Sequence, residues 1–249
     1  GTLGLLLLSI MVIAWRQRGM LKQSPALPTT IVALIGLQAA LGMWTVTMLL
    51  KPVIVTMHLL GGMTTLALVT WLSLRQFGGD RAQIAAAKLR PWALAGLVIL
   101  VCQIALGGWV STNYAALVCR DFPTCHEALI PNMDFEHGFH LARELGMTAQ
   151  GAPLSIEALT AIHWTHRVGA LITFLYLGTL AIALVRRGRR LLGKSLGALL
   201  VLQICLGIAN VVLTLPLPVA VAHNAGAAAL LVMMVVINFA LFRRPPARA

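Results

Sequence analysis

The sequence is poor in charged side chains. Only 10% of its 249 residues are Asp, Glu, Lys or Arg, whereas 59% are hydrophobic. A soluble globule of this size needs many more polar side chains to cover its surface, so the composition excludes an ordinary soluble domain and indicates a protein that lies in lipid. The sequence also lacks a glycine-rich phosphate loop and a nucleophile motif, and neither chemistry is expected.

Acidic residues are scarcer than basic ones, and the net charge is +12. A nucleic-acid partner is not expected, because the positions of the basic residues explain their number. Fifteen of the nineteen Lys and Arg fall in alternate connections between apolar runs, whereas the 113–160 connection holds six of the seven carboxylates. By the positive-inside rule the basic connections face the cytoplasm and the 113–160 loop lies outside. The fifteen are Arg16, Arg18, Lys22, Arg75, Arg81, Lys88, Arg90, Arg186, Arg187, Arg189, Arg190, Lys194, Arg243, Arg244 and Arg248.

Seven apolar runs are long enough, at about 20 residues, to serve as membrane spans across a core of roughly 30 Å. We therefore predict an all-α fold, a polytopic membrane helical bundle. The first run begins in mid-course at Gly1 with no basic segment or cleavage site, so we expect a truncated helix, not a signal peptide, and further sequence upstream. The predicted spans are 1–15, 30–50, 53–74, 91–112, 161–185, 195–215 and 218–242.

An internal repeat relates the two parts of the chain without a gap. Residues 34–42 match 199–207 at an offset of 165, and a third Gln-x-x-Leu-Gly occurs at 103–107. Leu-rich helices can align by chance, but Gln, Gly and His are scarce in such helices. The matched residues are Gln38 with Gln203, Gly42 with Gly207, His58 with His223, and Gly61 with Gly226.

The repeat predicts two pseudo-symmetric four-helix halves, with seven spans present of an expected eight. Residues 1–90 form the first half, which is incomplete. Residues 91–249 form the second half and carry the outer loop 113–160, for which we expect one or two short helices around 136–146.

Three histidines, His58, His166 and His223, lie within the apolar runs near their outer ends. An ionisable side chain at such a place is costly unless it is paired or functional. Imidazole is a common axial ligand of haem iron, and facing helices of a bundle can each supply one. We predict that His166 and His223 bind one haem iron and that His58 is an iron ligand in the first half. A hydrogen-bonded packing role is the alternative.

His58 needs a partner equivalent to His166, and the sequence contains none. Matching Arg18-Gly19 with Arg187-Gly188 puts that partner just upstream of Gly1. We therefore expect a His-Arg pair a few residues before this chain begins.

Two further residues flank His166. Arg167 stands on the outer side against the charge rule, and a haem propionate would be a suitable bidentate partner, with interfacial snorkelling as the alternative. His163 precedes His166 by one helical turn and is either an interfacial polar residue or part of the pocket.

The outer loop contains Cys119 and Cys125, for which a disulfide is expected in an oxidising compartment. Metal binding by this pair with His126 is the weaker alternative. His137 and His140 could also bind a metal, but solvated loop histidines are the simpler interpretation.

The chain resembles the haem A synthase family over essentially its whole length. The resemblance rests on the Gln-x-x-Leu-Gly helices and on His58, His166-Arg167, His223-Asn-Ala-Gly226 and the Cys119/Cys125 pair. Its most specific parts are the run 215–223 and the loop 113–125. The family's Glu before the first-half His-Arg would precede Gly1, and His163 stands at the equivalent place of the second half.

The resemblance implies an enzyme that oxidises a methyl group of haem O to the formyl group of haem A for terminal-oxidase assembly. It implies haem b bound by His166 and His223, and haem O as substrate at His58. The implied partners are haem O synthase and an unidentified electron donor or acceptor, with a possible homo-oligomer. The implied location is the bacterial inner membrane, with the haem sites toward the periplasmic face.

Two other functions fit the same residues. A two-haem cytochrome b that exchanges electrons with quinone would also use paired histidines. A repeat-built transporter could use them to handle protons, because transporters are often duplicated too.

Overall fold

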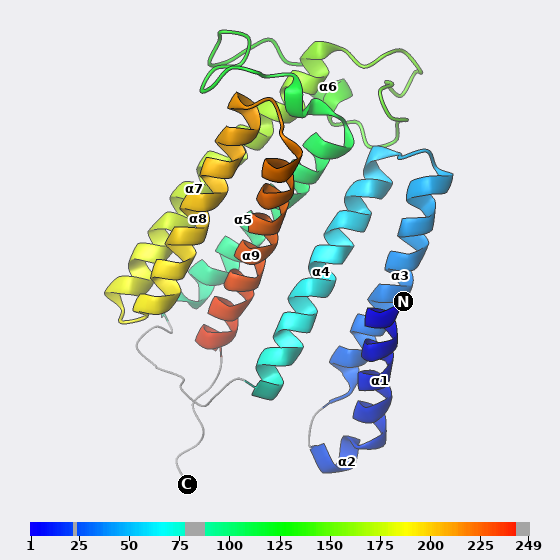
Figure 1. Cartoon of the computed structure of the whole chain (residues 1–249), viewed down its shortest axis with the longest axis vertical. Coiled ribbons are helices and arrows are strands. Elements are labelled where there is room, and N and C mark those ends of the chain that lie inside the picture. The colour runs from blue at the N-terminus through cyan, green and yellow to red at the C-terminus, as the bar shows by residue number, and fades with distance from the viewer. Residues whose placement is uncertain (22–23, 78–87, 243–249) are drawn as a thin grey trace.

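The structure is a computed structural model that describes residues 1–21, 24–77 and 88–242, and its regular elements are helices (Figure 1). Apart from two isolated β-bridges, the described residues contain no strand pairing. The elements are α1 (Thr2–Arg16), α2 (Arg18–Leu21), α3 (Ala26–Thr47), α4 (Pro52–Phe77), α5 (Arg90–Thr112), η2 (Ala115–Leu117), α6 (Phe135–Gly138), α7 (Ile156–Arg186), α8 (Arg190–Val212) and α9 (Leu217–Phe242).

Six of the helices, α3, α4, α5, α7, α8 and α9, are long and apolar enough to cross a membrane. The seventh predicted span is α1, an apolar helix of 15 residues whose Gly4 packs beside Ile35 of α3. The predicted all-α polytopic bundle is therefore confirmed. Three spans, α3, α7 and α8, begin four or five residues earlier than predicted. The Ser155 side chain accepts a hydrogen bond from the Ala158 N–H and starts α7 at Ile156, and α8 begins at Arg190, directly after a tight turn at Gly188.

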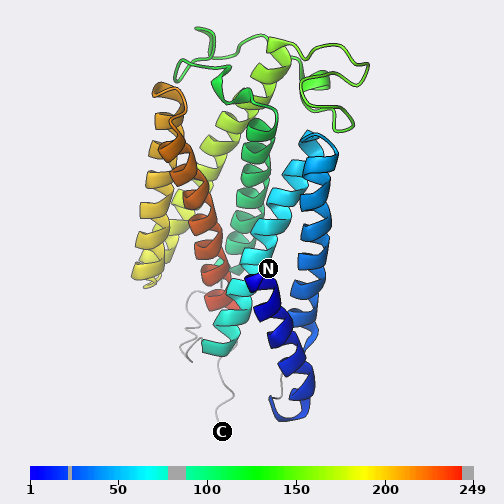
Figure 2. The same ribbon diagram turned by 45° about the vertical axis from the view of Figure 1, so that its right-hand side comes forward.

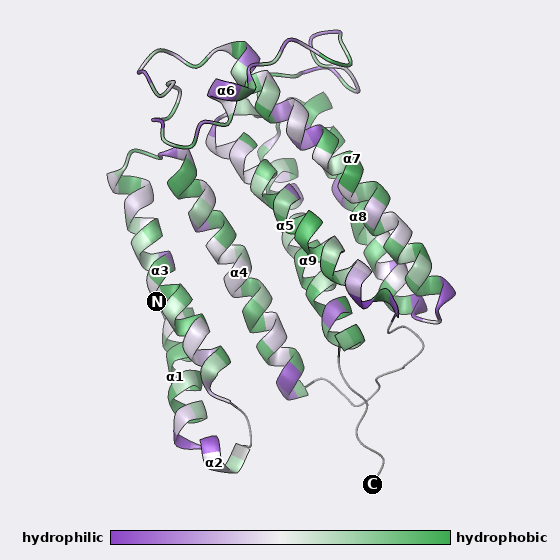
Figure 3. Ribbon diagram, turned by 180° about the vertical axis from the view of Figure 1, so that it is seen from behind, coloured by the Kyte–Doolittle hydropathy of each residue, from purple (hydrophilic) through white to green (hydrophobic). Residues whose placement is uncertain are grey.

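The bundle has two chemically different ends. Hydrophobic residues follow the lengths of the helices and hydrophilic ones gather at the ends and in the connections (Figure 3). One end, which we call the loop end, carries residues 113–155 together with the α3–α4 and α8–α9 turns (Figure 1). The opposite end, the basic end, carries the α7–α8 turn, the C-terminal end of α4 and the N-terminal end of α5. Among the basic residues assigned to the cytoplasm, Lys22, Arg81, Arg243, Arg244 and Arg248 lie outside the described residues.

Helices α5, α7, α8 and α9 form a ring in which neighbours pack in the order α5, α7, α8, α9 and back to α5. Their shared core includes Leu177, Leu196 and Met234, all completely buried. Helix α4 packs against both α5 and α9, and α3 and α1 follow outward from it (Figures 1 and 2). The division into halves at residues 90 and 91 remains a prediction, although the contacts α7–α8–α9 have their counterpart in α1–α3–α4.

The turns that join α3 to α4 and α8 to α9 have the same backbone. Each has two consecutive residues in the left-handed region, with φ of 49° and 60° at Leu49 and Leu50 and of 58° and 61° at Thr214 and Leu215. In both turns the second of these donates its N–H five residues back, with N–O distances of 2.9 Å to Thr45 and 2.7 Å to Asn210. All these positions are related by the offset of 165, so the sequence repeat is also a structural one.

The outer loop is less helical than expected. Of the one or two short helices expected around 136–146, only α6 is present, and η2 is a single 3-10 turn directly after α5. The Asp134 carboxylate accepts the His137 N–H and starts α6. At its end Gly138 meets α7 so closely that a Cβ built there would lie 2.7 Å from the Ala158 carbonyl oxygen. The chain turns away from the helical path after this contact.

Helices α7 and α8 approach most closely at Gly193, and this contact generates a prediction. A Cβ added there would lie 2.5 Å from the Ala181 carbonyl oxygen and 3.0 Å from the Val185 backbone nitrogen. Since neither backbone atom can move alone, Gly193→Ala should separate the helices and lower the free energy of unfolding by about 1–3 kcal/mol. Thermal unfolding in detergent, followed by circular dichroism, measures the change.

Gly197 is the matched control, because it lies one turn along α8 and a Cβ there meets nothing within 4 Å. Gly197→Ala should keep the wild-type midpoint or raise it slightly, since alanine favours the helix. Equal midpoints for the two variants would contradict the close contact.

Candidate haem site

Each of the three membrane histidines packs its ring against a glycine of the neighbouring helix. His58 of α4 faces Gly42 of α3, with Cε1 3.3 Å from a Cβ built on that glycine. The other two pairs are His166 of α7 on Gly107 of α5, at 3.0 Å, and His223 of α9 on Gly207 of α8, at 3.1 Å. All three glycines lie five residues before the loop end of their helix. The histidines are therefore at matching depth, as the sequence predicted.

The same helix pairs make a second, reciprocal contact. A glutamine four residues before each glycine covers another glycine, which lies three residues after the histidine. Gln103 donates from Nε2 to the His166 backbone oxygen and to His166 Nδ1, both at 3.0 Å. Gln203 donates from Nε2 to the His223 backbone oxygen at 3.0 Å, with a longer contact of 3.4 Å to its ring. We call each such arrangement of one glutamine, one histidine and two glycines a Gln–His unit.

His166 and His223 come from helices that lie diagonally across the ring, since α7 and α9 each pack against both α5 and α8. His58, on α4, belongs to the neighbouring unit of α3 and α4.

The donor set suits a haem iron. Imidazole is an axial haem ligand, and two are presented from diagonal helices at one depth. The Nδ1 atoms of His58 and His223 are buried and have no hydrogen-bond partner, which leaves them available as polar atoms in an apolar surrounding. The residues around His223 are small, because Ala222, Ala225 and Gly226 flank it on α9, and a flat macrocycle can approach such a helix closely. These residues fit the group that the sequence predicted.

Arg167 contacts the outer loop in this structure. Its Nη1 donates to the carbonyl oxygens of Asp121 and Thr124, at 2.9 and 2.8 Å, and its Nη2 donates to that of Cys119 at 2.8 Å. Its Nε is buried without a hydrogen-bond partner. The guanidinium thus holds the loop over α7, one residue from His166. Binding of a haem propionate by Arg167 stays a prediction.

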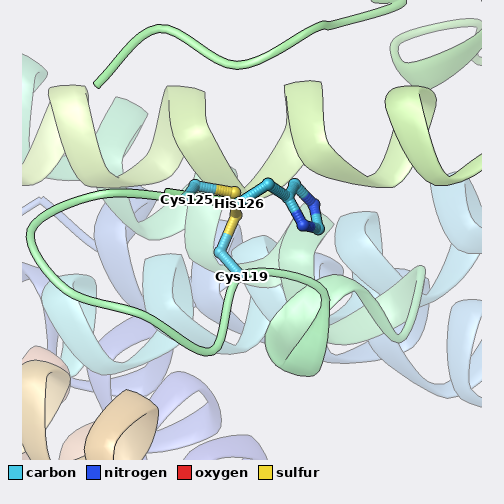
Figure 4. Close-up of side chains that lie close together, drawn as sticks. All are labelled: Cys119, Cys125 and His126. Carbon is cyan, nitrogen blue, oxygen red and sulfur yellow. A yellow bond between two sulfur atoms is a disulfide. The ribbon is translucent and has the colours of Figure 1, made fainter. Parts of the chain in front are cut away.

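The disulfide predicted between Cys119 and Cys125 is confirmed, with an S–S distance of 1.99 Å, and both cysteines are buried (Figure 4). One ligand atom of His126 lies within 4.8 Å of the two sulfur atoms. His126 Nε2 also contacts the Thr160 hydroxyl at 3.1 Å. Because both sulfurs are bonded to each other, this group serves as a clip of the loop in the oxidised protein.

The remaining histidines have structural partners or are exposed. His163 is buried and its Nδ1 donates to the Ala115 carbonyl at 2.9 Å, so it joins α7 to η2. His137 pairs with Asp134 at 2.7 Å in the cap of α6, and this contact contributes to a lowered Asp134 pKa after the larger effect of the His137 backbone N–H. His140 is exposed.

Sequence reasoning missed two sets of residues. It used the glutamines only as markers of the repeat, although their scarcity in apolar helices was a signal that they contact something polar. It also gave no role to Arg143, which is only 2% exposed. Arg143 Nη2 donates to Asn113 Oδ1 at 2.6 Å and its guanidinium stacks 5.6 Å from the Trp109 ring, so it ties the loop to α5. Burial lowers the pKa of Arg143.

The fold and the paired histidines define a class, the multi-pass α-helical membrane proteins with imidazoles gathered near one membrane face. Residues 1–235 match the model of the COX15-CtaA family, described as cytochrome oxidase assembly protein. The chain belongs to the haem A synthase family.

Similar proteins named heme A synthase occur in several bacteria. The protein from Shewanella oneidensis is 42% identical over 249 residues, which cover 98% of this chain and 74% of that protein. Those from a Caulobacter species and from Methylobacterium radiotolerans are 30% and 29% identical, each over 81% of this chain. This chain spans only 58% and 55% of the length of these two proteins.

The loop next to Arg167 yields a pH prediction. The Asp121 carboxylate accepts the backbone N–H groups of His126 and Glu127, both at 3.0 Å. A hydrogen bond from the Thr124 side chain, the largest cause, and these backbone bonds lower the Asp121 pKa from 3.8 to about 2. Since the folded loop prefers the ionised form, its stabilisation is complete above pH 4 and is lost as the pH falls toward 2.

Hydrogen exchange of residues 119–128, corrected for the intrinsic rate, should show severalfold weaker protection at pH 2.5 than at pH 5. Asp121→Asn removes the titrating group, so its protection should be the same at both pH values. Wild-type protection that does not change with pH would contradict this role of Asp121.

Proposed function

We propose that this protein is a haem A synthase, a membrane oxidoreductase that converts a methyl group of haem O into the formyl group of haem A for terminal-oxidase assembly. The observation that carries the proposal is the Gln–His unit, which presents imidazoles at one depth in a chain of the haem A synthase family. The relatives named heme A synthase support the same product.

In this proposal His166 and His223 bind the iron of a resident haem b. Their positions at one depth on diagonal helices of one ring suit ligation of a single iron by two imidazoles. Arg167 lies next to His166 with one buried guanidinium N–H free, which favours an acidic group of the ligand nearby.

His58 is the proposed ligand of the substrate haem O. It occupies in α4 the place that His223 has in α9, against the corresponding glycine and at the same depth. Because α4 packs directly against α9, the two haem sites would be neighbours, and electrons could pass between them.

Conversion of a methyl to a formyl group is a four-electron oxidation, in which RCH3 and H2O give RCHO, four protons and four electrons. Bound haem would supply the redox chemistry, whereas the protein would supply ligands, orientation and an apolar surrounding. The apolar helix faces around the histidines serve the last of these roles. An electron acceptor is therefore a required partner, and haem O synthase is the enzyme class that delivers the substrate.

The proposed location is the bacterial inner membrane, with the loop end on the periplasmic side. Three features support this orientation. The described connections at the basic end carry Lys and Arg, the acidic residues gather in the outer loop, and a disulfide persists in an oxidising compartment.

Removal of either resident-haem ligand tests the proposal. The purified protein should show a low-spin haem spectrum, and His166→Ala and His223→Ala should each abolish it. With only one imidazole ligand the iron becomes five-coordinate, or the haem is lost. His140→Ala is the matched control in an exposed loop and should keep the wild-type spectrum. A preparation without a Soret band would favour the transporter, and a low-spin spectrum retained in both alanine variants would contradict the ligand assignment.

Haem analysis distinguishes the synthase from an electron carrier. In cells that make haem O but lack another haem A synthase, expression of the protein should produce haem A, detected by extraction and mass spectrometry. His58→Ala should abolish haem A and retain the haem b spectrum of the second half. Haem b alone, with no haem A from the wild-type protein, would favour the two-haem carrier.

A further inference from the structure

We propose that Gln103 and Gln203 are positioning residues, which set the rotation and the hydrogen bonding of the His166 and His223 rings for iron ligation. This inference rests on the proposed function, because it takes these histidines as the haem ligands. It adds a pair of residues that act on the iron only through the histidines.

The first argument is geometric. Each glutamine reaches across to the neighbouring helix and contacts both the backbone oxygen and the ring of one histidine. One turn further along the same helix the ring meets a glycine with no space for a methyl group, at Gly107 or Gly207. The imidazole is thus held between an amide and a backbone, and this contact limits its rotation about the Cβ–Cγ bond.

The second argument is the cost of burying the amide. Gln103 Oε1 and Gln203 Oε1 are both buried without a hydrogen-bond partner. An unsatisfied acceptor is unfavourable in an apolar bundle, where leucine or methionine would pack without that cost. Both helix pairs of the second half nevertheless have a glutamine next to the histidine. Its presence in both pairs indicates a function beyond packing.

The third argument is the chemistry of the amide. When one ring nitrogen of a histidine binds iron, the other carries the proton and needs an acceptor, and the bond it makes orients the ring. An amide has a donor at one end and an acceptor at the other, so it can serve a ring nitrogen in either protonation state. Both orientations occur here. The amide nitrogen of Gln38 lies next to Gly61, whereas in the units of Gln103 and Gln203 the amide oxygen lies next to Gly169 and Gly226.

Two substitutions of similar size separate a hydrogen-bonding role from packing. Gln103→Met fills the same space over Gly169 but offers the ring no acceptor. Gln103→Glu offers the ring an acceptor oxygen but no longer donates to the His166 backbone oxygen. The corresponding pair, Gln203→Met and Gln203→Glu, repeats the test at the second ligand and keeps the inference testable if one methionine variant does not fold.

The measurements are electron paramagnetic resonance of the ferric haem and haem affinity from titration of haem b into the haem-depleted protein. The g-values of a low-spin haem report the relative rotation of its two imidazole planes, which a purely structural role of glutamine would not change. The methionine variants should shift the largest g-value and weaken haem binding by about 10- to 100-fold, the usual effect of losing a partner of a metal-binding histidine. The glutamate variants, which keep an acceptor for the ring, should stay closer to the wild-type g-value than the methionine variants.

Gln38→Met is the matched control, because it changes the same unit in α3 and α4 and should leave the haem b signal of the second half unchanged. Methionine variants with wild-type g-values and affinity would overturn the inference, and so would equal shifts in the methionine and glutamate variants. Failure of the proposed function has a different signature, because then the wild-type protein itself would lack a low-spin haem or retain it in His166→Ala.

Discussion

The structure depends on one constraint, that polar side chains inside a membrane span must find their partners within the protein. The Gln–His units of Gln103 and Gln203 meet part of this constraint, because each glutamine donates to a histidine of the neighbouring helix while its amide oxygen stays without a partner. Glycines at both contacts let the helices come close enough for the amide to reach the histidine, as Gln103 and Gln203 do. The unit therefore sets the spacing of each helix pair, the depth of each histidine and the direction of each ring together.

The loop end is organised by a related rule at the membrane surface. Two cations, Arg143 and Arg167, are buried or half-buried there and bind carbonyl and amide oxygens instead of acidic side chains. Arg167 joins the disulfide loop to the helix that carries His166, and Arg143 joins the following segment to α5. This connects the order of the loop to the position of the histidine directly beneath it, so the loop and the haem site form one structural unit.

Much of the fold and part of the site could be predicted because both depend on local pattern. Apolar length identified the seven helices, and the offset of 165 related His58 to His223 and also proved to relate the two turns at Leu49 and Thr214. The short helix α6 was predicted too long, since its end depends on the contact of Gly138 with α7, which no local pattern contains. The partners of Arg143 and Arg167 were missed for the same reason, because they are the Asn113 side chain and carbonyl oxygens that lie 30 to 48 residues away along the chain.

The sequence alone determined that the chain is a membrane bundle. It also determined which helix ends lie on the same side and which histidines share a depth, because hydropathy, charge and the repeat are all patterns along the chain. Only the tertiary structure decided that α7 and α9 lie diagonally, that Arg167 holds the loop and that glutamines reach the histidines. Those features depend on which helix faces lie against each other. In lipid every face of a helix is apolar, so hydropathy does not show which faces lie together. The packing of glycine against imidazole and amide determines which faces meet.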